Sequence, residues 1–338
     1  MFKRKQTPST VVGLELDPSY IAAAEVAVNG SITVKRGGVT PLRPGLLRDG
    51  EAQDAAGLAV ALREFFAEHE LPTRVRLGIA NQRIVVRSLD LPVEPDPKAL
   101  RAAVEAEAPD HIPMPMDEAV VDFQPLGVVA TPQGPRSRVV IAAVRRDMVE
   151  RLAHACRDAG LQLEGIDLSA FAMVRALAPD AGEEALLYVN VAGLTNVAVA
   201  NGTGCLFTRA ASGGLDVAEP LLGVLGDQAA ALGERVDHRV EGEPELVAAA
   251  RAVLDEGVHQ LADAVRNSLN FYRTQDGAET VNRALVTGPA IGIPGFTERL
   301  SELLNMPVEP VVVAVDADQE GLDAGRLSVA AGLAVEDR

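Results

Sequence analysis

The sequence predicts an α/β protein whose two related domains face each other across a cleft, and two observations lead to this fold class. A unit of three short apolar strands joined by tight turns occurs twice, at Val11–Arg36 and at Leu186–Gly214. In each copy an Asn-Gly dipeptide, a strong hairpin signal, separates the last two strands. After each copy, segments of strand length alternate with segments of helical periodicity, as in α/β proteins.

The first domain is predicted to span residues 1–182, and its elements follow the first three-strand unit in order. Residues 54–69 place four large apolar side chains on one helical face. Asn81–Leu91 alternates apolar and polar residues, which favours a half-buried strand. The other elements predicted are a strand at Val75–Ala80, a strand at Leu163–Asp167 and a short helix at Ser169–Leu177.

A small α+β subdomain is predicted inside the first domain, at residues 83–163. Its first helix is marked by Asp96-Pro97, where an aspartate suited to an N-cap precedes a proline at the first helical position. Gly160 marks the end of its last helix, and Asp147 is expected to cap the start of that helix. The segments predicted in order are a helix over 97–108, paired strands over 120–126 and 139–144, and the closing helix over 147–160.

The second domain is predicted to span residues 183–338 and to begin with the second three-strand unit. Residues 215–233 and 245–274 have helical patterns, with a break expected near Gly257. The remaining segments predicted are a strand at 284–287, a helix over 294–304, a strand over 308–315 and a final helix that ends near residue 335.

Charge and hydropathy exclude several classes of protein. The net charge of −17 argues against nucleic acid as a partner and against direct binding to anionic lipid, because both need a basic surface. No apolar run approaches the roughly 20 residues that a membrane-spanning helix needs. No apolar segment follows the basic N-terminus, so no signal peptide is predicted either. We therefore expect a cytoplasmic protein that does not insert into a membrane.

The turns of the two three-strand units are candidate phosphate-binding loops. Backbone N–H groups in turns of Gly, Ser and Thr can bind phosphate, and an acidic residue at a strand end can hold Mg²⁺. Asp17 and Pro18 suit this role poorly, because aspartate repels an anion and proline has no N–H. These loops favour a degenerate site, in which ATP with Mg²⁺ binds weakly or not at all. The candidate residues are Glu15, Ser19, Asn190, Gly193, Thr195, Asn196 and Gly288.

Other kinds of catalytic or metal site find no support in the sequence. The five histidines are scattered without the spacing of metal ligands, and neither GxSxG nor CxxC occurs, so we predict no metal site and no catalytic residue. A proline-stiffened apolar stretch, Ile112–Met116, has two interpretations. It is either a plug in the core or part of a groove for an extended peptide.

Four stretches are distinctive in order and content: Val104–Gly127 (VEAEAPDHIPMPMDEAVVDFQPLG), Arg266–Gln275 (RNSLNFYRTQ), Leu285–Val308 (LVTGPAIGIPGFTERLSELLNMPV) and Leu327–Val335 (LSVAAGLAV). They resemble motifs of the PilM family of type IV pilus assembly proteins, relatives of actin and of the cell-division protein FtsA. The resemblance covers nearly the whole chain. It implies an actin-like (ribonuclease H-like, duplicated) fold with the small subdomain inserted in the first domain, as in FtsA.

The same resemblance implies a function and a partner. It points to a cytoplasmic adaptor of the inner-membrane platform of a type IV pilus or related secretion machine, recruited to the inner face of the membrane by the N-terminal tail of a PilN-like protein. In the family that tail lies between the small subdomain and the rest of the first domain. The residues expected nearby are Ile112, Met114, Met116 and Phe123. Other platform or motor components, and a second copy of the chain, are further candidate partners.

Departures from the family pattern bear on the nucleotide. The aspartates at the two strand ends are replaced by Glu15 and Asn190, the lysine of the first loop is absent, and the double glycine of the third is Gly288-Pro289. We therefore expect weak or absent ATPase activity. The alternatives are an active actin-like ATPase that forms cytomotive filaments and a small-molecule kinase of the same fold. A kinase needs an intact phosphate loop and a catalytic aspartate near the second unit, and a filament protein needs a nucleotide switch.

Overall fold

The computed structural model of the chain describes residues 11–132, 134–178, 182, 184–212, 244–275, 277–293, 295–319 and 321–335, so the helix predicted at 215–233 lies outside the described residues. The first half contains β1 (Val12–Leu16), β2 (Tyr20–Asn29), β3 (Ser31–Pro41), β4 (Leu47–Arg48), β5 (Glu51–Ala52), α1 (Ala55–Glu68), β6 (Arg74–Ile79), β7 (Val85–Pro92), α2 (Pro97–His111), β8 (Ala119–Thr131), β9 (Gly134–Arg145), α3 (Arg146–Asp158), β10 (Gln162–Leu168) and α4 (Ser169–Leu177). The second half contains β11 (Leu186–Asn190), β12 (Leu194–Asn201), β13 (Gly204–Ser212), α7 (Pro244–Arg273), β14 (Ala284–Thr287), the 3₁₀ turn η1 (Pro289–Gly292), α8 (Phe296–Leu304), β15 (Val308–Pro310), β16 (Ala314–Val315), the 3₁₀ turn η2 (Ala317–Gln319) and α9 (Ala324–Leu333).

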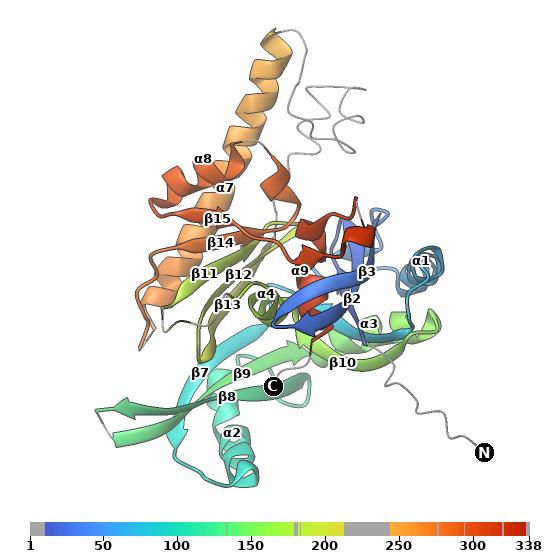
Figure 1. Ribbon diagram of the computed structural model, residues 1–338. Coiled ribbons are helices and arrows are strands. Elements are labelled where there is room, and N and C mark those ends of the chain that lie inside the picture. The colour runs from blue at the N-terminus through green and yellow to red at the C-terminus, as the bar shows by residue number, and fades with distance from the viewer. Residues whose placement is uncertain are drawn as a thin grey trace, which may run out of the picture.

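Two main sheets repeat one topology, which confirms the predicted duplication (Figure 1). The first has the order β10-β6-β1-β2-β3-β16 and the second has the order β13-β12-β11-β14-β15. In each, three consecutive antiparallel strands come first, and a later strand pairs in parallel with the first of them. This is the arrangement that the two copies of the three-strand unit predict.

Helices α4 and α9 lie between the two sheets (Figure 1). Alternate residues of β1 point to opposite faces of the first sheet. Val12 and Leu14 pack in the core with α1 and α3, whereas Gly13 faces α9 on the other side. A Cβ at Gly13 would stand 1.9 Å from the Ala330 carbonyl oxygen, so the close approach of α9 requires glycine. In the second sheet, α7 and α8 cover the other face, where Leu187 is buried.

The second half differs from its prediction at α7, which runs unbroken through Gly257. A glycine inside a helix costs about 1 kcal/mol relative to alanine, too little to interrupt a helix whose apolar stripe is buried. That stripe continues beyond the glycine, since Leu261, Val265 and Leu269 are all buried against the second sheet. Among the described residues, no helix is both long and apolar enough to cross a membrane.

The single strand predicted at 308–315 is two strands in different sheets. β15 pairs with β14 in the second sheet, whereas β16 pairs with β3 in the first, where Ala314 lies opposite Thr33. The chain therefore crosses back between the domains, and α9 then packs on β1 and β2. Leu327 and Ala330 are fully buried there. The helix α9, which the prediction placed in the second domain (residues 183–338), thus packs on the first sheet with one face, and its Val329 and Leu333 pack with α4 and the second sheet.

The small sheet has the antiparallel order β7-β9-β8 and lies below the main sheets in Figure 1. Asp96 caps α2 through the Lys98 N–H, at 3.2 Å, as predicted. The N-cap of α3 is Arg145, not Asp147, whose carboxylate lies inside the first turn and accepts from the Met148 N–H. Gly160 ends the helix with a φ of 85°, as predicted. After β9 the chain leaves the small sheet, since α3 packs with α1 and β10 joins the first sheet.

Candidate functional site

The two candidate phosphate loops meet where the two domains touch. Glu15 lies near the end of β1 and Asn190 ends β11, and both side chains are buried. The amide nitrogen Nδ2 of Asn190 donates to Oε1 of Glu15 at 3.4 Å. Equivalent positions of the two repeats are therefore in direct contact across the domain junction.

The carboxylate of Asp17 lies between the two loops and accepts four hydrogen bonds. Its Oδ1 accepts from the backbone N–H and the hydroxyl of Ser19, at 2.9 and 2.5 Å, within its own loop. From the opposite loop, Gly193 N–H donates to Oδ1 at 3.1 Å and Leu194 N–H donates to Oδ2 at 3.0 Å. A Cβ at Gly193 would stand 2.5 Å from Oδ1, so this approach needs glycine.

Two acids are buried together at this junction. Burial raises the pKa of Glu15 well above its ordinary value of 4.5, and the neighbouring charge of Asp17 raises it further. Burial also raises the pKa of Asp17, although the hydrogen bonds from Ser19, Leu194 and Gly193 lower it in part. Three buried polar atoms nearby, Oε2 of Glu15, the hydroxyl of Tyr20 and Oδ1 of Asn190, have no hydrogen-bond partner among the described residues.

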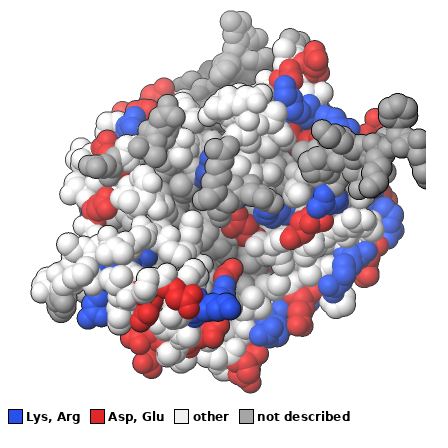
Figure 2. All heavy atoms as spheres, turned by 60° about the horizontal axis from the view of Figure 1, so that its bottom comes forward, with Lys and Arg blue, Asp and Glu red and all other residues white. Residues whose placement is uncertain are grey.

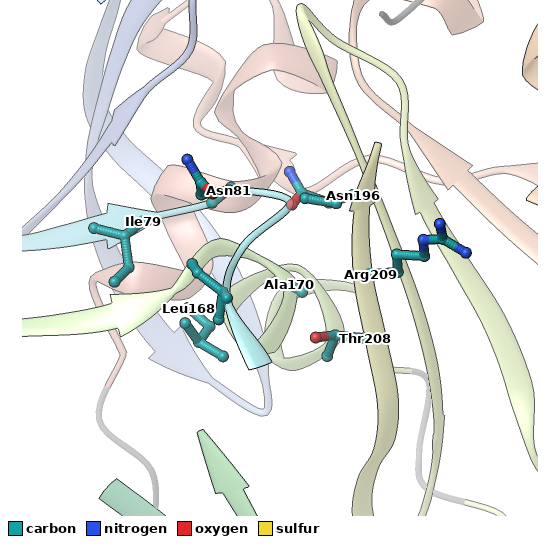
Figure 3. Close-up of a pocket in the computed structure, with 10 residues that line it drawn as sticks. Ile79, Asn81, Leu168, Ala170, Asn196, Thr208 and Arg209 are labelled. Carbon is teal, nitrogen blue, oxygen red and sulfur yellow. The ribbon is translucent and has the colours of Figure 1, made fainter. Parts of the chain in front are cut away.

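A small cavity beside these loops spans the same domain junction. Figure 3 shows Ile79, Asn81 and Leu168 of the first half lining one side of it, with Asn196 and Thr208 of the second half on the other. Its volume is about 20 Å³, which is enough for one water molecule. It does not hold a nucleotide.

The residues at the junction do not fit a nucleoside triphosphate with Mg²⁺. Two N–H groups that would bind phosphate already donate to Asp17, and the two acids Glu15 and Asp17 are buried at the loops. Gly288, at the third loop, has a φ of 97°, and a Cβ there would stand 2.5 Å from the Val191 carbonyl oxygen. This third loop therefore packs directly on the second.

Most of the residues predicted for the nucleotide site do come together. Ser19 and Gly193 donate to Asp17, Asn190 donates to Glu15, and Gly288 packs on Val191 and Asn190. Thr195 and Asn196 are buried at the start of β12, close to these contacts. From the sequence alone, Asp17 is expected only to repel phosphate. The signal for its role is its place before Pro18-Ser19, since an aspartate at a turn accepts the N–H two residues on.

A larger cavity of about 520 Å³ separates the small sheet from the first sheet. One wall is formed by β8 and β9, with Val120, Val140 and Ala142, and the other by β10 and α4, with Ile166 and Phe171. Both β8 and β10 are edge strands of their sheets. The cavity is thus an apolar groove bounded by two strand edges, with Asp122 and Asp167 as its acidic residues.

Of the four residues predicted for a peptide groove, only Phe123 lines this cavity. Ile112 is buried on the opposite face of the small sheet, under α2, and Met114 packs against the same cluster. Met116 is exposed and lies outside the lining residues. Those placements agree with the alternative interpretation of the proline-rich stretch as a plug in the core. Strand alternation explains the difference, since Val139 and Ile141 face α2 whereas Val140 and Ala142 face the groove.

The surface around the small subdomain carries both signs of charge. Figure 2, which brings the bottom of Figure 1 forward, shows acidic and basic side chains interspersed over the described part of this face, with uncharged surface between them. On this face the described basic residues lie next to acidic ones instead of forming one continuous patch. Such a surface does not attract a polyanion.

The fold and the sequence match known proteins along nearly the whole chain. A structure described as the PilM-PilN type IV pilus biogenesis complex superposes with a TM-score of 0.77 at 28% identity, over 97% of this chain and 98% of that one. The ethanolamine utilization protein EutJ from Carboxydothermus hydrogenoformans has a TM-score of 0.57 at 17% identity, over 98% of this chain and 91% of that one. MreB5 of Spiroplasma citri bound to AMPPNP has a TM-score of 0.51 at 12% identity, over 96% and 95%.

These likenesses confirm the actin-like fold expected from the sequence. The family model described as type IV pilus assembly protein PilM matches residues 13–337, and this range includes both sheets and the groove beside them. The chain belongs to the PilM family of type IV pilus assembly proteins.

Proposed function

We propose that this protein is a cytoplasmic adaptor in the inner-membrane assembly platform of a type IV pilus or a related secretion machine, and that it binds the N-terminal tail of a PilN-like membrane protein. The tail would recruit it to the inner face of the membrane. Membership of the PilM family and the likeness to the PilM–PilN complex support this role. Other platform or motor components, and a second copy of the chain, remain predicted partners.

The groove between the small sheet and the first sheet is the observation that carries the proposal. Its volume of about 520 Å³ lies in the range of small ligand sites, roughly 300–1,000 Å³, and suits a few apolar side chains. The edges of β8 and β10 offer backbone groups to an extended segment, which can add to a sheet edge as a further strand. An extended apolar tail is therefore the ligand that this groove accepts best.

The proposal treats the nucleotide site as degenerate, so that ATP with Mg²⁺ binds weakly or not at all. The hydrogen bonds from Gly193 and Leu194 to Asp17, and the raised pKa of Glu15, support this assignment. A nucleotide-driven filament protein and a small-molecule kinase would both need free phosphate-binding amides at this place. The observed arrangement favours neither alternative.

The experiment is a titration of a fluorescent synthetic PilN-like tail with the purified full chain. Ala142→Leu fills the groove from β9, and we expect it to weaken binding at least about tenfold. Met116→Asp, on the exposed loop outside the groove, is the matched control and should bind like the wild type. Thermal melting of each variant shows that it is folded. Equal binding by Ala142→Leu and wild type, or loss of binding in Met116→Asp, contradicts the proposal.

A further inference from the structure

The buried carboxylate of Asp17 joins two domains that are far apart along the chain. Its two acceptor oxygens take the N–H groups of Gly193 and Leu194, which are 176 and 177 residues away. The side chain is only 3% exposed, and Ser19 holds the carboxylate from its own loop through an N–H and a hydroxyl. Hydrogen bonds from four donors stabilise the buried carboxylate of Asp17.

The two N–H groups that point at Asp17 lie at the beginning of β12, in the turn after β11. Consecutive backbone N–H groups in a turn form a small concave site for an anion. In this chain the anion comes from the chain itself, and the glycine at position 193 removes the Cβ that would block it. The site and its occupant are therefore built from residues of opposite domains.

We propose that Asp17 is an internal anion that takes the place of a bound phosphate and holds the two domains closed when no nucleotide is present. A bound phosphate would bridge the loops of both domains through such amides. The Asp17 carboxylate makes the same bridge permanently. Domain closure in this protein then needs no ligand.

The other contacts between the two halves fit a closed arrangement that does not depend on a ligand. β16 continues the chain from the second sheet into the first, and Lys35 pairs with Asp316 beside it at 2.5 Å. The hydroxyl of Ser88, in β7, contacts the Leu206 carbonyl oxygen of β13 at 3.5 Å. The bonds from Gly193 and Leu194 to Asp17 are more buried than the Lys35–Asp316 pair and the Ser88 contact, so their loss should have a larger effect on closure.

The test uses hydrogen exchange and small-angle scattering on the full chain without nucleotide. In Asp17→Ala we expect the amides of Gly193 and Leu194 to exchange at least about tenfold faster than in the wild type, because their acceptor is gone. The radius of gyration should also increase. If Asp17→Ala does not fold, Asp17→Asn keeps the shape of the side chain but lacks the charge and one acceptor, and it should show a smaller change in the same direction.

Asp54→Ala is the matched control, because the Asp54 carboxylate accepts the Gly57 N–H at 2.9 Å within one domain, at the start of α1. It should speed exchange at Gly57 and leave the radius of gyration unchanged. Unchanged protection of Gly193 and Leu194 in both Asp17 variants would overturn the proposal. So would faster exchange of these amides without any increase in the radius of gyration.

Discussion

The carboxylate of Asp17 accepts the backbone N–H of Gly193 at 3.1 Å, and this contact joins the turn of the first repeat to the turn of the second. Both turns occupy the same place in the strand arrangement that the two sheets repeat. One turn now supplies the anion and the other supplies the donors. The two candidate phosphate loops are thus joined by a direct contact between the domains.

Glu15 gives a prediction for the pH dependence of stability. Because burial raises its pKa well above 4.5, the folded state binds more protons than the unfolded state above that pH. The free energy of unfolding should therefore fall as the pH rises from about 4.5 towards the raised pKa of Glu15 in the folded state. Glu15→Gln removes this loss and should raise stability at neutral pH.

Urea unfolding of the wild type and Glu15→Gln at pH 5 and pH 8 measures this effect. Glu118→Gln, at an exposed position, is the control and should follow the wild type at both pH values. A Glu15→Gln variant that loses stability between pH 5 and pH 8 as steeply as the wild type would show that Glu15 is not the source of the slope.

Arg175 gives a prediction about the C-terminal helix. Its guanidinium donates to the Gly332 carbonyl oxygen at 3.0 Å and pairs with Asp167 at 2.5 Å, with both side chains largely buried. Arg175→Met leaves the Asp167 carboxylate buried beside an uncharged side chain, so we expect a loss of about 3–5 kcal/mol in the free energy of unfolding. Chemical denaturation measures it.

The exposed pair of Arg266 and Asp263 on α7 provides the comparison for this result. Arg266→Met should change stability by less than about 0.5 kcal/mol, since exposed ion pairs contribute little. A similar small change in Arg175→Met would mean that Arg175 does not hold α9. Addition of Asp167→Asn to Arg175→Met should restore part of the lost stability, because no charge is then left buried.

Gly13 gives a prediction about the packing of α9 on the first sheet. Gly13→Ala places a Cβ 1.9 Å from the Ala330 carbonyl oxygen, and the helix must move to relieve the overlap. We expect a destabilisation of about 1–3 kcal/mol, measured by urea unfolding. Gly165→Ala, in β10, meets only the Arg76 side chain at 3.6 Å and should be close to neutral. Equal effects of the two substitutions would contradict this account of the packing.

Local signals predicted the fold well, and contacts between distant segments explain what they missed. The Asn-Gly turns and the apolar strands mark the duplicated unit, because hairpin chemistry is encoded within a few residues. The pairing of Asp17 with Gly193 is not local: the repeated unit relates the two turns, but it does not predict that a side chain of one turn accepts the N–H groups of the other. The division of residues 308–315 between two sheets has the same origin, since strand partners are set by tertiary packing.

The groove shows the same limit for a functional site. The alternation along β9 separates Val139 and Ile141 from Val140 and Ala142, but it does not say which face α2 covers. The prolines beside Ile112 and Met114 led to the prediction that these residues line the groove, but both pack on the face of the small sheet that α2 covers. Phe123 is among the residues that line the groove, but its side chain packs against the cluster under α2, where the Arg101 guanidinium lies over its ring.

A photo-crosslinking measurement tests the central claim, that the groove binds the tail, most directly. A benzophenone amino acid replaces Gln124, which lines the groove, or Met116, which lies outside it, and a synthetic PilN-like tail is added to the full chain. We predict that mass spectrometry finds the tail joined to position 124 and not to position 116. Crosslinks at position 116 without any at position 124 would contradict the account.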